Sequence, residues 1–201
     1  MNLESIREKI AYQPVLLGIF ALLASGALAW ASSATGEAIA AAEAKDLRDS
    51  LSEVLPAGLA DNDFLKDTVD LKNGEKTVTI YRARKEGVVK AALFKVAERG
   101  YAGDIQVLMA VDSDGRTLGV RVLKHSETPG LGDKIEVKKD PWVKSFDGKS
   151  LGDPAPEKWA VRKDGGIFDQ FAGATITPRA VVKAVKGGMD FFTAHKAEII
   201  G

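Results

Sequence analysis

Four hydrophobic patterns follow one another along this chain of 201 residues, and the first is an uncharged apolar run from Pro14 to Ala34. At about 1.5 Å of rise per residue, roughly 20 helical residues cross a hydrocarbon core about 30 Å thick. The run therefore predicts a membrane-spanning helix, so residues 1–34 form an N-terminal tail and membrane anchor. A cleaved signal peptide is the alternative, because the Ala-Leu-Ala sequence at 27–29 has the small-x-small form of a cleavage site.

Basic residues beside the span do not decide its orientation. Arg7 and Lys9 precede it among acidic neighbours, and Lys45 and Arg48 follow it. Only basic residues close to a span count strongly, and these are evenly divided. Because a first short span usually leaves the N-terminus inside, we expect a single-pass protein of the inner (cytoplasmic) membrane with its C-terminal domain on the periplasmic side.

The second pattern predicts a helix over Glu37 to Leu55, within a helical connector at 35–58. Helix formers dominate this segment, and Pro56 and Gly58 end it. Its apolar side chains recur at helical spacing: Leu47, Leu51, Val54 and Leu55. A solvated stalk would be more uniformly polar, so we expect one side of this helix to rest on the following domain.

The third pattern consists of short segments rich in β-branched and aromatic residues, separated by turn-forming residues. They are Thr68–Leu71, Thr77–Arg82, Val88–Val96, Ile105–Val111 and Leu118–Leu123. The intervals are too short for helical crossovers, which favours an antiparallel meander over a Rossmann-type sheet. The Asp-Ser-Asp-Gly sequence at 112–115 superficially resembles a calcium loop, but it lacks the later glutamate and favours a hairpin turn.

The fourth pattern predicts a C-terminal helix from about Pro178 to Ala197, with Thr177 as its cap and Pro178 in its first position. Between the sheet and this helix, residues 125–168 lack periodicity and predict long loops around short strands, which are often functional. The predicted fold class is α+β: an N-terminal transmembrane helix, then a single domain at 59–201 with a mainly antiparallel sheet and flanking helices.

Composition excludes several chemistries. The chain has no cysteine, which removes thiolate catalysis, disulfides and cysteine-held metal centres. Only His125 and His195 are present, so a three-histidine metal site is impossible. With 28 basic and 28 acidic residues, the net charge is zero, which argues against nucleic acid as a partner.

The strongest local signal is the sequence Asp-Gln-Phe-Ala-Gly-Ala-Thr-Ile-Thr-Pro at 169–178. Gly173 and Ala174 leave little bulk in a turn just before a helix start, where free N–H groups and the helix dipole favour a phosphate. Arg179 would add positive charge, and Thr175 would lie beside the anion. On these residues alone, the simpler interpretation is a tight loop with Thr175 as an ordinary capping residue.

Three stretches together resemble a known family. They are Gly-Tyr-Ala-Gly-Asp-Ile at 100–105, His-Ser-Glu-Thr-Pro-Gly-Leu-Gly at 125–132, and residues 169–178. In order and spacing they are similar to the FMN-binding domain family, which includes the G subunits of Rnf electron-transport complexes and the C subunits of sodium-pumping NADH:quinone reductases. The single N-terminal span also fits this family.

The resemblance implies FMN joined through its phosphate to a threonine hydroxyl in the motif Asp-x-x-Ser/Thr-Gly-Ala-Thr/Ser. The acceptor is then Thr175, with Asp169 at the acidic position and Gly173 and Ala174 in the turn. The chain departs from the motif once, because Ala172 replaces the usual hydroxyl residue. Thr177 is the rival acceptor. Since a threonine hydroxyl is a weak nucleophile and this chain shows no adjacent histidine or cysteine arrangement to activate it, a separate flavin transferase is implied by chemistry and by the resemblance.

The stretch at 125–134 provides further candidate cofactor-binding residues. Its Thr-Pro-Gly-Leu-Gly turn is stiff and then permissive, so it can bring Leu131 and backbone groups close to the flavin ring. The candidates are His125, Glu127, Thr128, Gly130, Leu131 and Lys134. A structurally bonded His125 and a solvated Lys134 are the alternatives, and we assign Trp142 and Trp159 to packing.

The functional hypothesis is therefore a redox subunit rather than a stand-alone enzyme. The resemblance implies an electron-transfer subunit of an ion-translocating ferredoxin:NAD oxidoreductase (Rnf) complex, with the other Rnf subunits, the flavin transferase and the membrane as partners. The alternative is a membrane-tethered binding or assembly module without flavin. A stand-alone FMN-dependent reductase ranks below both, because the chain has no dinucleotide fingerprint.

Overall fold

The structure is a computed structural model that describes residues 12–201. The residues before the predicted span, with Arg7 and Lys9, lie outside this described part. The chain divides into two compact units, residues 1–46 and residues 47–201. The second unit contains the sheet and the C-terminal helices.

The N-terminal helix α2, Tyr12–Glu53, is a single helix of 42 residues. The predicted span and the predicted connector helix are continuous, because the Ala- and Glu-rich residues that join them contain no proline and favour helix throughout. Its apolar part is long enough to cross a membrane. Large apolar side chains there are exposed in the chain itself, including Leu17, Leu22 and Trp30, as expected for groups that face lipid.

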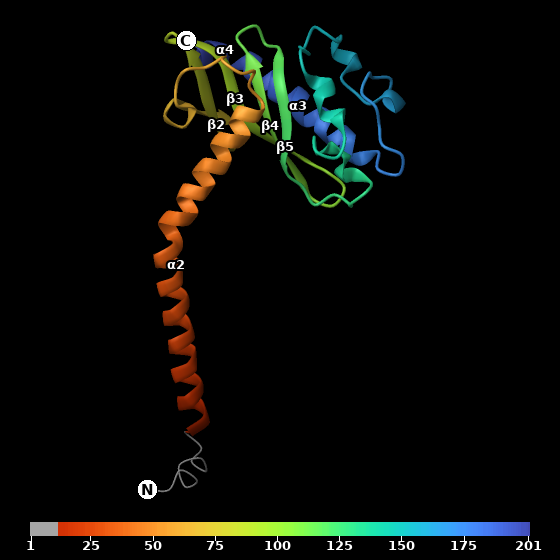
Figure 1. The fold of residues 1–201 in the computed structure, drawn as a ribbon. Helices are drawn as coiled ribbons and strands as arrows, with labels where there is room; N and C mark the ends of the chain where they lie inside the picture. The colour runs from red at the N-terminus through yellow and green to blue at the C-terminus, as the bar shows by residue number, and fades with distance from the viewer. Residues whose placement is uncertain (1–11) are drawn as a thin grey trace, which may run out of the picture. The chain divides into compact units, whose positions relative to one another are not determined.

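Five strands form one antiparallel sheet in the order β1-β2-β3-β4-β5 (Figure 1). Their bounds are β1 Thr68–Asn73, β2 Lys76–Lys85, β3 Val88–Arg99, β4 Asp104–Asp112 and β5 Thr117–Lys124. The predicted meander and the α+β class are confirmed. Each strand contains the whole of its predicted segment and extends beyond it.

Turn residues set the register of this meander. Between β2 and β3, Glu86 and Gly87 both have positive φ values of 54° and 79°, which matches the twist of a two-residue hairpin. Between β4 and β5, the Asp112 carboxylate accepts hydrogen bonds from the backbone N–H groups of Asp114 and Arg116. Asp112 therefore organises a hairpin turn, as predicted.

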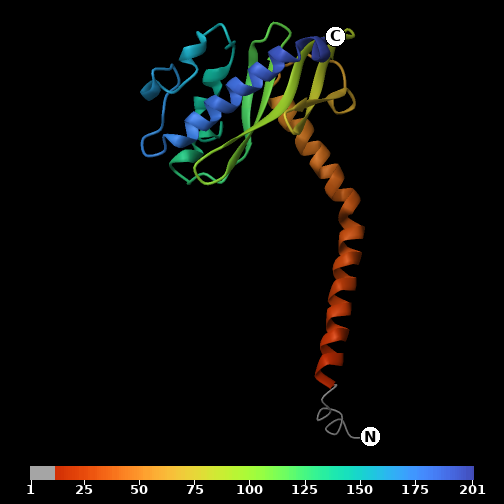
Figure 2. The ribbon, with the colours of Figure 1, turned by 180° about the vertical axis from the view of Figure 1, so that it is seen from behind.

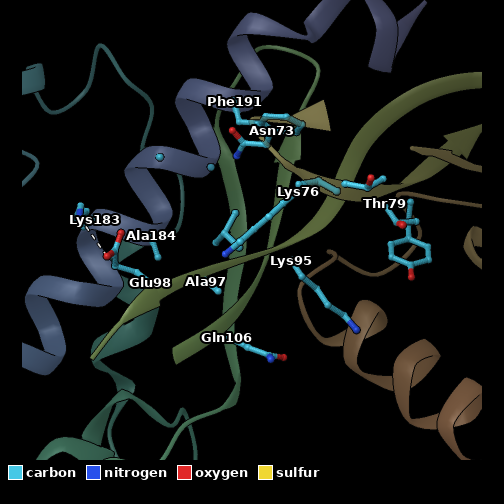
Figure 3. A pocket seen from close by; sticks show the side chains of 16 residues that line it. Asn73, Lys76, Thr79, Lys95, Ala97, Glu98, Gln106, Lys183, Ala184 and Phe191 are labelled. Carbon is cyan, nitrogen blue, oxygen red and sulfur yellow. Dashed lines mark ion pairs between the residues drawn. The ribbon is translucent and has the colours of Figure 1, made fainter. Parts of the chain in front are cut away.

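Strands β2 and β3 pair over only part of their length. Their register runs from Ile80 opposite Phe94 to Lys85 opposite Val88, and it does not include residues 76–79 or 95–99. A cleft lies where the two strands separate, and Figure 3 shows the side chains around it.

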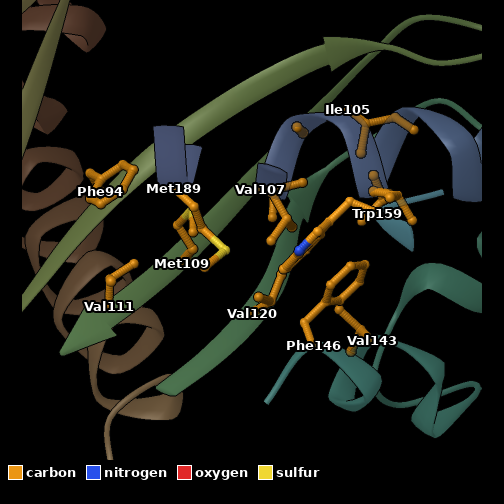
Figure 4. Packing of buried hydrophobic residues seen from close by; sticks show 14 of the residues in the cluster. Phe94, Ile105, Val107, Met109, Val111, Val120, Val143, Phe146, Trp159 and Met189 are labelled. Atoms are coloured by element: carbon orange, nitrogen blue, oxygen red, sulfur yellow. The ribbon is translucent and has the colours of Figure 1, made fainter. Parts of the chain in front are cut away.

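The helix α3, Ile176–Ala194, lies across one face of the sheet (Figure 2). Apolar side chains from both elements form the main core, including Phe94, Met109 and Met189 (Figure 4). Gly188 permits close packing, because a Cβ there would lie 3.0 Å from Val96 Cγ1. A short helix α4, Lys196–Ile200, follows. The predicted helix thus begins two residues earlier and ends three residues earlier than expected.

A second apolar cluster covers the opposite face of the sheet. Leu51 near the end of α2 and Val54 just after it are buried in one cluster with Leu93 and Leu108 of the strands. Gly119 allows this approach, since a Cβ there would lie 2.6 Å from the backbone oxygen of Val54. The last turns of α2 therefore belong to the sheet domain.

The region between β5 and α3 contains 3-10 helices instead of the predicted short strands: η2 Gly132–Ile135, η3 Pro141–Phe146, η4 Pro156–Lys158 and η5 Arg162–Asp164. Prolines begin η3 and η4, where no N–H is required. Trp142 and Trp159 pack with neighbouring phenylalanines, including Phe146, at ring-centroid distances of 5.4 Å and 6.3 Å. Both tryptophans thus serve packing, which fixes the segment that leads to α3.

Candidate functional site

A cavity of about 390 Å³ lies at the N-terminal end of α3. All three family-like stretches contribute to it, although they are distant in the sequence. Its lining residues are Tyr101, Glu127, Thr128, Leu131, Gly132, Gly173, Ala174, Thr175, Ile176, Thr177 and Arg179. The fold therefore brings together the residues that carry the resemblance.

A tight turn leads into the helix at one wall of this cavity. The Ala174 N–H donates to the Phe171 carbonyl oxygen over 3.2 Å, and Gly173 in the turn has φ of +79°. An L side chain rarely adopts this conformation, which explains the glycine. The Trp142 indole N–H anchors the preceding backbone by donating to the Asp169 carbonyl oxygen over 2.8 Å.

Thr175 is the N-cap residue of α3, whereas the sequence assigned that role to Thr177. Its backbone is in the right-handed helical region, and its side chain makes no capping hydrogen bond. An N-cap side chain ordinarily accepts from an N–H of the first turn. Thr175 lines the cavity, and the residue is half-buried. Pro178 lies in the first turn, where its missing N–H has no intrahelical partner in any case.

Thr177 has a different environment two residues later. It is only 1% exposed, and its hydroxyl donates a hydrogen bond to Glu127 Oε2. This interaction joins the helix start to the 125–132 loop. Thr177 is therefore a structural residue whose hydroxyl is already engaged.

The Glu127 carboxylate joins three segments. It is 4% exposed, and its Oε1 accepts from the Ala102 N–H over 3.1 Å while its Oε2 accepts from Thr177. Two glycines make room for it: a Cβ at Gly100 would lie 2.6 Å from Glu127 Oε1, and one at Gly132 would lie 2.8 Å from Thr177 Oγ1. Glu127 thus lines the cavity and holds its walls together.

The loop at 128–132 folds over the turn. The Thr128 carbonyl oxygen accepts from the N–H groups of Leu131 and Gly132, and Gly130 has φ of +78°. This arrangement leaves Leu131 43% exposed at the cavity, with its Cδ2 at 3.5 Å from a Cβ built at Gly173. Leu131 is therefore placed as a free apolar surface beside Thr175.

Four other predicted site residues, His125, Gly130, Lys134 and Asp169, are not among those that line the cavity. Lys134 is exposed, and the Asp169 carboxylate pairs with Arg162 at 2.9 Å. His125 Nδ1 accepts from the Glu127 N–H, so its Nε2 donates to Glu136 Oε1 over 3.0 Å. His125 therefore supports the loop.

A cluster of charged side chains follows the 128–132 loop in the sequence. Lys139 pairs with Asp133 at 2.8 Å and with Glu136 at 2.6 Å. The Lys139 ammonium, through these hydrogen bonds, lowers the pKa of both carboxyl groups, and the Asp133 and Glu136 carboxylates raise the pKa of Lys139. Lys139 thus ties Asp133 of η2, the helix that Leu131 precedes, to the residues that follow it.

Arg179 brings positive charge to the cavity but is paired. Its Nε lies 2.5 Å from Asp164 Oδ2, and its Nη2 lies 2.6 Å from Asp164 Oδ1. The guanidinium lowers the pKa of the Asp164 carboxyl, and the carboxylate raises the pKa of Arg179. Thr175 and Arg179 are four residues apart and so share one face of the helix.

The sequence did not single out two cavity residues, Tyr101 and Ile176. Tyr101 is 69% exposed and Ile176 is 47% exposed, although both carry large apolar surfaces. An aromatic residue in a glycine-flanked turn was the available signal for Tyr101. Ile176 carried no separate signal, because an isoleucine at a helix start ordinarily packs inward.

These features define a class of protein. Residues 100–190 match the profile of the FMN-binding domain family, and this range includes all three stretches that form the cavity. The fold and cavity therefore belong to an FMN-binding domain joined to an apolar helix.

The comparisons also identify a narrower family. The chain is 52% identical over 187 residues to the G subunit of the ion-translocating oxidoreductase complex of Cereibacter sphaeroides, covering 92% of this chain and 85% of the relative. It is 46% identical over 200 residues to the corresponding G subunit of Pseudomonas aeruginosa, covering 96% and 94%. The chain therefore belongs to the family of these G subunits. The crystal structure of Shewanella oneidensis NqrC is 27% identical, with a TM-score of 0.48 and coverage of 71% and 72%.

Proposed function

We propose that this protein is a membrane-anchored electron-transfer subunit of an Rnf complex and carries FMN covalently on Thr175. Its family membership and FMN-binding domain support this function. The observation that carries the assignment of the acceptor is that Thr175 lines a cavity at a helix start and its side chain makes no capping hydrogen bond.

Thr175 is a better acceptor than Thr177 because of their environments. The Thr177 hydroxyl is buried and donates to Glu127, so its modification would require that interaction to break. Thr175 is half-buried and borders the cavity. Attachment forms a bond from Thr175 Oγ to phosphorus, releases the hydroxyl proton and breaks the bond to a leaving group on the flavin donor.

The cavity fits the phosphate end of FMN. The first turn of α3 has backbone N–H groups without intrahelical acceptors, and the positive end of the helix dipole lies there. Arg179 retains further N–H donors beyond the two that Asp164 engages. These groups would hold the phosphate next to Thr175.

The cavity also fits the ring of FMN. Tyr101, Leu131 and Ile176 present exposed apolar surface at its rim. Such surface is the usual lining of a site for a flat, partly apolar cofactor. When bound, FMN supplies one- and two-electron chemistry, and these side chains would orient the ring and exclude water from one side of it.

We further propose that a separate flavin transferase installs the cofactor, because no described histidine lies among the cavity residues to activate Thr175. Thr175 is half-buried rather than buried, which modification by a second protein requires. The anchor is retained, and the domain lies on the periplasmic side. A covalent bond suits that compartment, since it replaces reversible binding by permanent local concentration. The partners are the other subunits of the complex.

Fluorescence on denaturing gels tests the acceptor. The full chain co-expressed with a flavin transferase is expected to give a fluorescent band with the mass of one FMN attached. Thr175→Ala should lose the band, and Thr175→Ser should keep it because the hydroxyl is retained. Folded Thr177→Ala should keep it as well. A fluorescent Thr175→Ala chain would contradict the assignment, and an unmodified wild type from its own host would favour the module without flavin.

A further inference from the structure

A second cavity of the sheet domain, the cleft between β2 and β3, lies apart from the cavity at the start of α3. Its volume is about 690 Å³, and β1, β2, β3, β4 and α3 all contribute to it. The two cavities have no lining residue in common. Figure 3 shows its labelled side chains, with the Lys183–Glu98 ion pair on the α3 side.

The backbone of β2 turns an unpaired edge toward this cleft. The Arg82 N–H donates to the Asp67 carbonyl oxygen, on the β1 side of the strand. Backbone groups alternate between the two sides of a strand, so those of Thr77 and Thr79 point away from β1. Both residues precede Ile80, where the pairing with β3 begins.

The backbone of β3 also turns unpaired N–H and C=O groups toward the cleft. Leu93 lies opposite Tyr81 in the paired region, so its N–H and C=O point toward β2. The groups of Lys95 and Ala97, two and four residues later, point the same way and lie beyond the last paired residue. Thr77, Thr79, Lys95 and Ala97 all line the cleft. Two open strand edges thus meet within one sheet.

The charge of the cleft is positive. Lys183 is neutralised by Glu98 at 3.1 Å. Lys76 and Lys95 also line the cleft, and neither forms an ion pair with any residue from 12 to 201. A natural occupant that is acidic would therefore be favoured over a second copy of this chain, which would bring the same basic surface.

We propose that this cleft binds an extended, acidic segment of another subunit of the same complex. The inference rests on the proposed membership of that complex. Rows of N–H and C=O groups at strand spacing are complementary to an extended peptide backbone, which can add as a strand. The two free lysines would pair with acidic side chains of that segment. This contact would hold the domain to its complex while the flavin cavity stays free.

Site-specific photo-crosslinking in the assembled complex tests the occupant. A benzophenone amino acid replaces Thr79 or Ala97 in the full chain, with Lys85 and Lys90, outside the cleft, as control positions. Crosslinks from 79 and 97, but not from 85 or 90, to an acidic segment of another subunit identified by mass spectrometry are expected. An intact complex without these crosslinks overturns the proposal, and so do crosslinks to a second copy of this chain or to lipid.

Charge reversal gives a second measurement. Lys76→Glu combined with Lys95→Glu should lower co-purification with the other subunits by about fivefold, and Lys90→Glu combined with Lys138→Glu should not. Unchanged co-purification in the first variant would contradict the acidic occupant. Covalent flavin fluorescence should persist in both variants. Absence of this fluorescence from the wild type would refute the proposed function, whereas crosslinking and co-purification test the occupant of the cleft.

Discussion

The proposed flavin cavity beside Thr175 and the β2–β3 cleft are both open to solvent, but different interactions hold their walls. Around the cavity, buried side chains join separate segments, with Glu127 bonded to both Ala102 and Thr177. Around the cleft, two strand edges remain unpaired, and the one ion pair, Lys183–Glu98, is exposed on the lysine side. The cavity is therefore preorganised by hydrogen bonds within the chain, whereas the cleft keeps strand-edge N–H and C=O groups unpaired.

Among the variants that test this difference, Glu127→Ala is expected to have the largest effect on stability. It leaves the buried Thr177 hydroxyl and the Ala102 N–H without their acceptor, so the free energy of unfolding should fall by about 3 kcal/mol. Urea unfolding of the wild type and the variant measures this change. Glu98→Ala, at the cleft, removes a partly exposed pair and should cost less than about 1 kcal/mol. Equal losses of unfolding free energy in the two variants would contradict this difference between the sites.

Replacing glycine by alanine should change the free energy of unfolding in opposite directions at the two sites. A Cβ at Gly132 would lie 2.8 Å from Thr177 Oγ1 and 3.0 Å from Glu127 Cβ, so Gly132→Ala should destabilise the domain by about 1–3 kcal/mol. At the cleft, Gly187 has nothing within 4 Å of its Cβ position and lies inside α3. Gly187→Ala should therefore stabilise by about 0.5–1 kcal/mol. Thermal unfolding of both variants provides the check, and a destabilised Gly187→Ala would show that the cleft is packed.

The smallest expected effect is a pH dependence of the stability that the Arg179–Asp164 ion pair contributes. The Arg179 guanidinium lowers the pKa of Asp164 below its usual value of 3.8. The pair therefore contributes stability above that value and loses it as the pH falls through the lower, folded pKa. The melting temperature of the wild type should exceed that of Asp164→Asn at neutral pH, and the difference should shrink below about pH 4. A difference that stays constant down to about pH 2 would exclude this linkage.

Much of the fold could be predicted because its signals are local. The five strands follow from β-branched segments separated by turn residues, and the Asp112 turn follows from its own side chain. The predictions failed where tertiary packing overrode a local rule. Residues 125–168 have no periodic pattern, and their 3-10 helices are held by tryptophan packing that sequence spacing does not reveal.

For the candidate site, the sequence determined which stretches matter, and the family resemblance selected Thr175. Local rules could not assign the roles of the two threonines, because Thr177 before a proline is as good a cap as Thr175. The tertiary structure distinguishes their environments. A carboxylate 50 positions earlier in the chain engages the Thr177 hydroxyl, whereas Thr175 precedes the first helical residue, Ile176, and lines the cavity.

The sequence by itself determined the apolar span, the meander, the C-terminal helix and the glycine turn, because each depends on neighbours within a few residues. Only the tertiary structure decided which hydroxyl is free, which loop residues line the cavity and where β2 separates from β3. Those properties depend on contacts between segments far apart in the chain, such as that of Glu127 with Ala102 and Thr177, and no local pattern encodes them.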